Sequence, residues 1–222
     1  MNIENESTVT VLGSQWAYPI ADLANAWIKR NEIAGDVARI TPSDTGSMIS
    51  IALLLVVMLE SYTVRAVIDG KSVDSSCFIN GTLSAKLWWE KSDCEDKAKV
   101  IDAFSLRDAL AHNHVYWLDA SWDAQELVLE NILVGGKKRF FDRVENGKFI
   151  NSGLSSLPNA MHPTDILILV AVVSNALSYL RTKCTRIGNI DFGFVRSASA
   201  KNMWDLLTRA AKLALVNCES RV

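Results

Sequence analysis

The sequence contains no apolar run long enough to cross a lipid bilayer. Its most apolar stretches are Met48–Leu59 and Ile166–Val173, whereas a membrane-spanning helix needs about 20 consecutive apolar residues. The first residues, Met1–Val11, are polar and acidic and do not have the basic and apolar segments of a secretory signal. We therefore expect a cytoplasmic protein with no membrane partner, in which both apolar stretches form buried core helices.

The sequence also lacks the clusters of cysteine, histidine and carboxylate side chains that bind metals. The four cysteines lie far apart in the chain, at Cys77, Cys94, Cys184 and Cys218. This spacing excludes a zinc knuckle or a redox pair, and without a secretion signal the thiols are expected to be reduced and structural. Asp93, Glu95 and Asp96 are typical of charges at the start of a helix. We therefore expect neither a metal nor a cofactor.

Charge is distributed unevenly along the chain. The net charge is −2, but residues 1–179 carry 15 basic and 22 acidic side chains, while residues 180–222 carry 8 basic and 3 acidic ones. A basic C-terminal segment can attract a polyanion such as a nucleic acid. A solvated helix face followed by a basic tail is the simpler explanation, because a basic patch alone is a weak functional signal.

Apolar residues at helical spacing predict a mainly α fold. Helices are expected over residues 19–30, 44–68, 96–118, 164–183 and 202–216. The second of these is apolar on all sides over Ile51–Leu59, which is typical of a buried central helix. The bulky pair Trp88-Trp89 is expected to close the core of the resulting bundle.

Polar residues mark the expected boundaries of two of these helices. Ser43 or Asp44 is expected to be the N-cap of the central helix, which ends at Asp69-Gly70. Ser92-Asp93 is expected to cap the helix over residues 96–118.

Residues 122–155 differ from the rest of the chain. Short strands are expected at Glu126–Val134, Arg139–Val144 and Lys148–Ile150, with turns at Gly135-Gly136 and Asn146-Gly147. This segment is therefore predicted to form a small β-meander inserted in the helical bundle. The length of the chain favours a single domain over residues 1–222.

A compact group of charged and polar side chains lies within the expected third helix. It reads Arg107-Asp108-Ala109-Leu110-Ala111-His112 and is followed by Asn113-His114. This pattern resembles the signature of the HEPN superfamily, in which an arginine, often followed by a polar residue, precedes a histidine by four to six residues. The match covers this helix well and the neighbouring long helices only in general layout, and the inserted strands are not part of the family's core pattern.

The resemblance implies a function as well as a fold. HEPN proteins are compact α-helical bundles, usually dimers, and many are metal-independent endoribonucleases that act as toxins or in anti-phage defence. It therefore implies RNA as substrate, a homodimer and a neutralising antitoxin protein as partner. Arg107 would hold the phosphate, His112 would move the proton and Asp108 would orient His112, with His114 as the second candidate for the proton-transfer role. Histidine suits proton transfer at neutral pH, and arginine suits a phosphate.

Helix geometry leaves the choice between the two histidines open. At about 100° per residue, His112 lies roughly 140° around an ideal helix from Arg107, whereas His114 lies only about 20° away. Asp108 precedes His112 by one helical turn, where a carboxylate can hold the imidazole and raise its pKa. We favour His112, because the polar residue directly after Arg107 fits the shorter pattern of the family.

A second cationic segment mixes basic and aromatic residues. Lys137, Lys138 and Arg139 are followed by Phe140-Phe141, a combination that occurs in sites for single-stranded RNA. The preceding Gly135-Gly136 does not have the spacing of a phosphate-binding loop. The three basic residues are therefore candidate RNA contacts, and a hairpin turn beside core phenylalanines is the alternative.

The motif also has a purely structural explanation. Arg107 can pair with Glu60 or Asp108 inside the bundle, with both histidines as ordinary core or rim residues. Glu60 lies on the apolar central helix, where it is a candidate for a buried charge facing the motif. In that case the chain is a non-catalytic helical module that binds a nucleotide, RNA or a protein. The arrangement of the two motifs in a dimer distinguishes the two functions. Motifs that face each other across an open cleft favour the nuclease, whereas motifs that are buried and salt-bridged favour the binding module.

Overall fold

Helices form the greater part of the described residues, and they occur where the helical periodicity of the sequence is strongest. The computed structural model describes residues 13–33, 41–70, 74–79, 81–111, 116–123, 126–134, 142–184, 187, 190–195 and 200–219, with the backbone alone over 116–134. Within these residues the fold is mainly α, as predicted. The helices are α1 (Ala17–Ile33), α2 (Pro42–Asp69), α3 (Ala85–Lys91), α4 (Lys97–Ala111), α6 (Pro163–Lys183) and α7 (Met203–Glu219). Short 3-10 turns are η1 (Gly13–Trp16), η2 (Ser75–Cys77), η3 (Pro158–Ala160) and η5 (Gly193–Val195).

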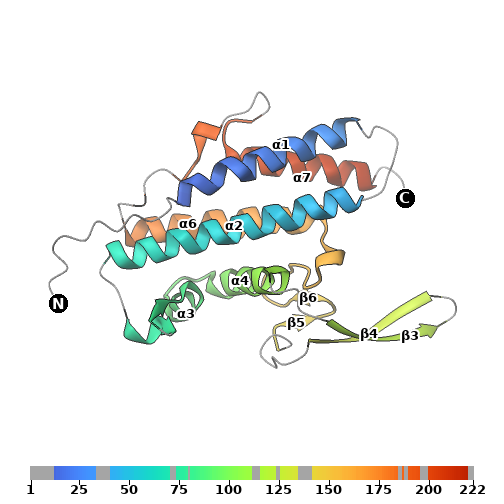
Figure 1. Ribbon diagram of the computed structural model, residues 1–222, viewed down its shortest axis with the longest axis horizontal. Coiled ribbons are helices and arrows are strands. Elements are labelled where there is room, and N and C mark those ends of the chain that lie inside the picture. The colour runs from blue at the N-terminus through green and yellow to red at the C-terminus, as the bar shows by residue number, and fades with distance from the viewer. Residues whose placement is uncertain are drawn as a thin grey trace.

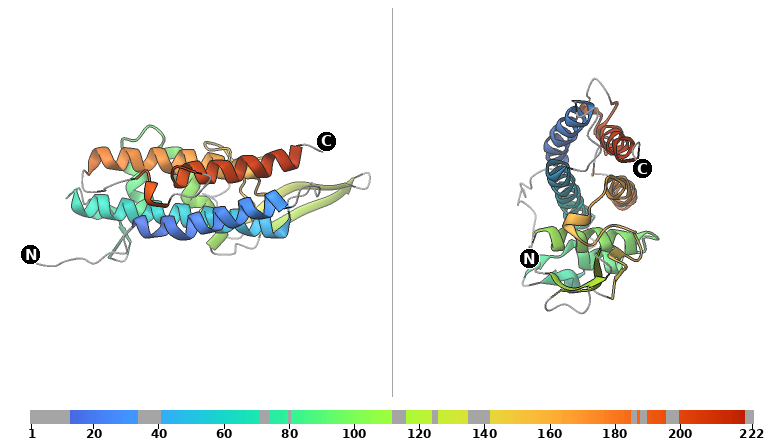
Figure 2. Two further views of the ribbon diagram at one scale, coloured as in Figure 1. Left: turned by 90° about the horizontal axis from the view of Figure 1, so that it is seen from above. Right: turned by 90° about the vertical axis from the view of Figure 1, so that its right-hand side faces the viewer.

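The helices are arranged in three layers, and α2 lies in the middle layer. Figures 1 and 2 show α1 and α7 on one side, α2 and α6 in the middle, and α3 and α4 on the other side. Helix α2 packs against α1, α3, α4 and α6, so the all-apolar segment Ile51–Leu59 lies at the centre of the fold, as predicted. Leu55, Leu59 and Leu169 are completely buried in this core. The apolar helices thereby remove their side chains from water.

The two ends of α2 follow from its local sequence. Its N-cap is Thr41 and not Ser43 or Asp44, so that prediction is wrong by two or three residues. Pro42 is the first helical residue, and Asp44 completes a capping box by accepting the backbone N–H of Thr41 at 3.0 Å. At the other end, the N–H of Gly70 donates to the carbonyl of Ala66 at 2.9 Å, which confirms the stop at Asp69-Gly70.

Among the residues described, two helices are long and apolar enough to cross a membrane by length and composition, so the exclusion of a membrane span from the length of the apolar runs is wrong. The two helices are Pro42–Asp69 and Pro163–Lys183. About half of each apolar window is buried inside the fold, at 56% and 50% respectively. The core helices of soluble proteins share both properties, and the packing of α2 against four other helices accounts for its apolar residues.

The helix that carries the motif is shorter than predicted. Helix α4 ends at Ala111, and Tyr116–Asp123 forms strand β3, so a helix over 96–118 is wrong. The segment after residue 115 contains Tyr, Trp and Leu at close spacing, and aromatic residues favour strands. Ser92 does not cap α4 either, because it ends the separate helix α3, which the sequence analysis missed.

The predicted β-meander is confirmed only at its second turn, where Asn146-Gly147 joins two short paired strands. Strand β3 forms an antiparallel hairpin with β4 (Glu126–Val134), in register from Tyr116 opposite Val134, and Figure 1 shows this hairpin extending away from the helices. A second, separate hairpin joins β5 (Val144–Glu145) to β6 (Lys148–Phe149). Among the residues described, strand β4 pairs with the aromatic-rich segment before it. The predicted turn at Gly135-Gly136 and the first half of the predicted strand Arg139–Val144 lie outside these residues. A further two-stranded pair joins β1 (Phe78–Ile79) to β2 (Thr82–Leu83).

A buried carboxylate ties the second hairpin to the motif helix. Asp102 of α4 is completely buried and accepts the backbone N–H groups of Asn151 and Ser152 at 3.2 and 3.0 Å. The side-chain amide of Asn151 also donates to it at 3.4 Å, and Arg143 Nη1 lies 3.8 Å away. Burial nevertheless raises the pKa of Asp102 above its ordinary value, against the opposing effect of these partners. The segment that follows β6 is thus fixed to α4 one and a half turns before Arg107.

Candidate functional site

Arg107 lies near the end of α4 and is held by carboxylates on both sides. Its Nη2 atom donates to Glu60 Oε1 of α2 at 3.3 Å, and its Nε atom lies 3.3 Å from Asp108 Oδ1. The guanidinium carbon is 5.8 Å from the centre of the Phe104 ring, within cation–π range. The side chain of Arg107 is 22% exposed. The guanidinium therefore lies at the edge of the core, where Glu60 and Asp108 orient it and solvent can still reach part of the side chain.

Glu60 faces the motif, as the sequence analysis predicted, but it is not a buried charge. Its side chain is 36% exposed and pairs with Arg107. The pair joins the central helix α2 to the motif helix α4. Because both groups remain partly hydrated, the pair is expected to contribute little to stability, on the order of 0–1 kcal/mol. Its role is to orient the guanidinium more than to hold the fold together.

A residue that the sequence analysis did not single out completes the group. Lys86 of α3 places its Nζ atom 3.6 Å from Asp108 Oδ2 and 3.1 Å from Ser105 Oγ. Asp108 is thus contacted by Arg107 on one carboxylate oxygen and by Lys86 on the other. No spacing in the sequence links Lys86 to Asp108, because their contact depends on how α3 packs against α4.

A buried tryptophan fixes the helix that carries Lys86. Trp89 is completely buried, and its indole N–H donates to Thr63 Oγ1 of α2 at 2.9 Å. Trp88 packs edge-on against it, with ring centroids 5.2 Å apart. The prediction that this pair closes the core is confirmed. Lys86 precedes Trp89 by three residues, so one anchored turn of helix sets the position of its ammonium group.

The four charged groups form a chain across three helices. It runs from Glu60 to Arg107, then to Asp108 and Lys86, with two charges of each sign. The Nε–H of Arg107 is buried without a hydrogen-bond acceptor in the described part of the molecule, because its approach to Asp108 is an ion pair of poor hydrogen-bond geometry. Because this donor is itself buried, a further anion can reach Arg107 only at the part of its side chain that is exposed, 22%.

The remaining predicted site residues cannot be placed. His112 and His114 lie outside the described residues, as do Lys137, Lys138 and Arg139. His112 directly follows Ala111, the last residue of α4. Since residues 116–123 form a strand, the predicted helix does not continue to residue 118.

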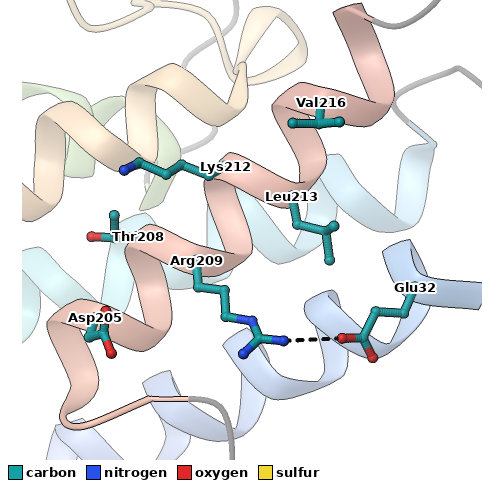
Figure 3. Close-up of a pocket in the computed structure, with 7 residues that line it drawn as sticks. All are labelled: Glu32, Asp205, Thr208, Arg209, Lys212, Leu213 and Val216. Carbon is teal, nitrogen blue, oxygen red and sulfur yellow. Dashed lines mark ion pairs between the residues drawn. The ribbon is translucent and has the colours of Figure 1, made fainter.

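A shallow groove lies on the opposite side of the fold, between α1 and α7 (Figure 3). It has a volume of about 450 Å³ and is lined by Glu32, Asp205, Thr208, Arg209, Lys212, Leu213 and Val216. Arg209 pairs with Glu32 at 3.5 Å, and elsewhere Lys183 pairs with Asp93 at 2.9 Å. These basic residues are thus paired with carboxylates of the same chain, which favours a solvated helix face over a polyanion-binding site for the basic C-terminal segment.

No metal-binding cluster occurs among the residues described: no three or more His, Cys, Asp or Glu side chains are arranged to hold an ion there. Comparison with protein-family models, with curated proteins and with solved structures finds no match to this chain. The resemblance to the HEPN superfamily therefore rests on residues 107–114 and the general layout of long helices.

Proposed function

We propose that this chain is a metal-independent endoribonuclease of the HEPN type, a homodimer that acts as a toxin or in anti-phage defence. The observation that carries the proposal is the setting of Arg107. Its guanidinium is oriented by Glu60 and Asp108, remains partly exposed, and lies in the last turn and a half of α4, immediately before His112. Metal-free phosphodiester cleavage needs a preorganised cation and a histidine that moves a proton, and His112 is proposed for the second role on the sequence motif.

The proposed reaction is an internal transfer of the RNA phosphodiester. The 2′-oxygen forms a bond to the adjacent phosphorus, and the bond from phosphorus to the 5′-oxygen breaks. A 2′,3′-cyclic phosphate and a 5′-hydroxyl result, with net transfer of a proton from the 2′-oxygen to the 5′-oxygen. His112 accepts the proton from the 2′-hydroxyl. Arg107 offsets the charge that develops on the phosphate oxygens.

The other residues keep the roles that the resemblance gives them. Asp108 orients His112. The Asp108 carboxylate cannot do this while both of its oxygens are fully engaged by Arg107 and Lys86. His114 is the second candidate for proton transfer. Lys137, Lys138 and Arg139 are proposed RNA contacts on the sequence pattern alone. A neutralising protein partner belongs to the same proposal.

The partly buried face of α2 beside Glu60 is the surface proposed for the dimer. Val57 and Leu53 precede Glu60 by three and seven residues, so the three side chains lie on one side of α2. Both apolar side chains are only partly buried. We expect light scattering at micromolar concentration to give twice the 24.5 kDa chain mass. A strict monomer at that concentration would contradict a site shared between two chains.

We expect RNA cleavage to persist in EDTA. In the proposed mechanism Arg107 and His112 supply the charge and the proton transfer that a metal-bound water would otherwise provide. The measurement is the initial cleavage rate of a mixed RNA substrate with and without chelator, at matched ionic strength. Loss of all activity with EDTA, restored by added magnesium or manganese, would show that the mechanism is wrong.

The alternative is a helical module that binds RNA, a nucleotide or a protein without catalysis. The observation in its favour is that the charge of Arg107 is already compensated by Glu60 and Asp108. The position of Arg107 can then be explained by its two ion pairs within the fold, without a bound phosphate. Binding of RNA with no cleavage by the parent protein, under conditions where it is folded and dimeric, would establish the alternative in place of the nuclease.

A further inference from the structure

Asp108 is the only carboxylate of the charged chain that touches two cations, among the residues described. Arg107 approaches its Oδ1 atom and Lys86 its Oδ2 atom, at 3.3 and 3.6 Å. The two cations come from different helices, α4 and α3, and each is anchored separately. Arg107 is oriented by Glu60 of α2, and Lys86 donates to Ser105, whose side chain is buried. The structure thus contains a two-cation clamp around a single oxyanion.

We propose that Lys86 is a second phosphate-binding cation of the site, and that Asp108 occupies the position an RNA phosphate takes when substrate binds. The proposal rests on the proposed ribonuclease function, because it identifies what the same site does before RNA arrives. A carboxylate and a phosphodiester each offer two anionic oxygens to basic side chains. RNA displaces the Asp108 carboxylate, and Arg107 and Lys86 exchange one oxyanion for another.

The exposure of the three side chains agrees with such an exchange. The side chains of Arg107, Lys86 and Asp108 are 22%, 32% and 33% exposed, so none is sealed in the core. Contacts of a partly hydrated carboxylate with two cations are weak enough to be replaced. The released carboxylate becomes available to His112, four residues further along the chain. Binding of RNA and activation of the histidine are thereby coupled through one side chain.

Lys86 differs from an ordinary surface lysine in how it is held. Its helix is anchored by the buried Trp89 and its hydrogen bond to Thr63. Lys91, on the same helix, is the matched comparison. It pairs with Asp74 at 3.3 Å, its side chain is 46% exposed, and it does not contact the motif. Replacing either lysine removes the same charge from the same helix, so a difference between them reports position and not net charge.

The test is binding of a fluorescent single-stranded RNA with 2′-O-methyl groups, which has no 2′-hydroxyl to react. Lys86→Met should weaken binding about three- to tenfold and lower the slope of log Kd against log salt concentration by about 0.7, the value for one lost phosphate contact on a single strand. Asp108→Asn should tighten binding by a similar factor, with Asp108→Ser as a second variant in case the first folds poorly. Lys91→Met should bind like the parent.

Four results would each overturn the inference. Lys86→Met binds RNA with the same affinity and salt slope as the parent, or both Asp108 variants bind RNA more weakly than the parent. Lys91→Met loses as much RNA affinity as Lys86→Met, or the parent does not bind RNA at all. The outcome is separable from that of the proposed function, which is scored by cleavage of unmodified RNA. If the parent cleaves RNA but the variants bind alike, only the clamp is wrong. If the binding shifts appear but the parent never cleaves, the clamp stands and the nuclease does not.

Discussion

His112→Ala is expected to cleave RNA about 10²–10⁴ times more slowly than the parent protein, because it removes the group that moves the proton. Its stability should change little, because a histidine that acts on RNA must be open to solvent and not part of the core. Arg107→Ala should lose cleavage as well, through loss of the phosphate-binding cation. The measurements are single-turnover cleavage rates and thermal unfolding of each purified variant.

His162 provides the control for this experiment, and His114 tests the other assignment of the proton-transfer role. His162 caps α6, where its ring accepts the backbone N–H of Thr164. His162→Ala should therefore cost about 0.5–2 kcal/mol of stability with no specific effect on cleavage. His114→Ala should mainly affect stability, by roughly 1–2 kcal/mol. If His114→Ala is inactive but stable while His112→Ala cleaves normally, their roles must be exchanged. Parental cleavage in all variants, Arg107→Ala included, would move the site elsewhere.

Asp102→Ala is expected to destabilise the protein by about 2–4 kcal/mol, because it leaves buried donors without an acceptor. Asp102 is completely buried and accepts two backbone N–H groups and the side-chain amide of Asn151. Its loss should release the segment after β6 from α4. Chemical denaturation of the variant and the parent gives the difference directly.

An exposed carboxylate of the same region is the control for Asp102. Asp96 precedes α4 and pairs with Lys99 at 2.8 Å, and its removal should cost less than about 0.5 kcal/mol. Similar unfolding free energies for Asp102→Ala and Asp96→Ala would contradict the anchoring role.

The effect of Asp102 on stability should also depend on pH. Burial raises the pKa of its carboxyl in the folded protein above the ordinary 3.8, so the folded state binds a proton that the unfolded state has released. Stability from this source is greatest below the ordinary pKa and is lost as pH rises through the folded pKa. The difference in unfolding free energy between the parent and Asp102→Ala should therefore decrease as pH rises above about 4. An increase over that range would contradict the shift.

The long helices were predictable because their signals are local. The periodicity and the Pro and Gly residues near its two ends define α2 to within a few residues, although the N-cap proved to be Thr41. Helix α3 was missed because a helix of seven residues gives too short a pattern. The end of α4 was misplaced because the pairing of β3 with β4, a tertiary contact, makes residues 116–118 part of a strand.

The site was predictable only in part for the same reason. The contact of Glu60 with Arg107 was one of the two pairings that the structural alternative predicted, because both residues lie on helices that the sequence defines well. Lys86 was not expected, because its position depends on the packing of Trp89 beneath a helix that the pattern did not show. Which histidine acts with Arg107 stays a prediction from the motif.

The central claim, metal-free cleavage through the 2′-hydroxyl, is tested most directly by end-group analysis of RNA cut in EDTA. The purified parent protein should leave 2′,3′-cyclic phosphates and 5′-hydroxyl ends, and the Arg107→Ala, His112→Ala double variant, purified in parallel, should leave the RNA intact. Ends with 5′-phosphates, or equal cleavage by the double variant, would contradict the claim.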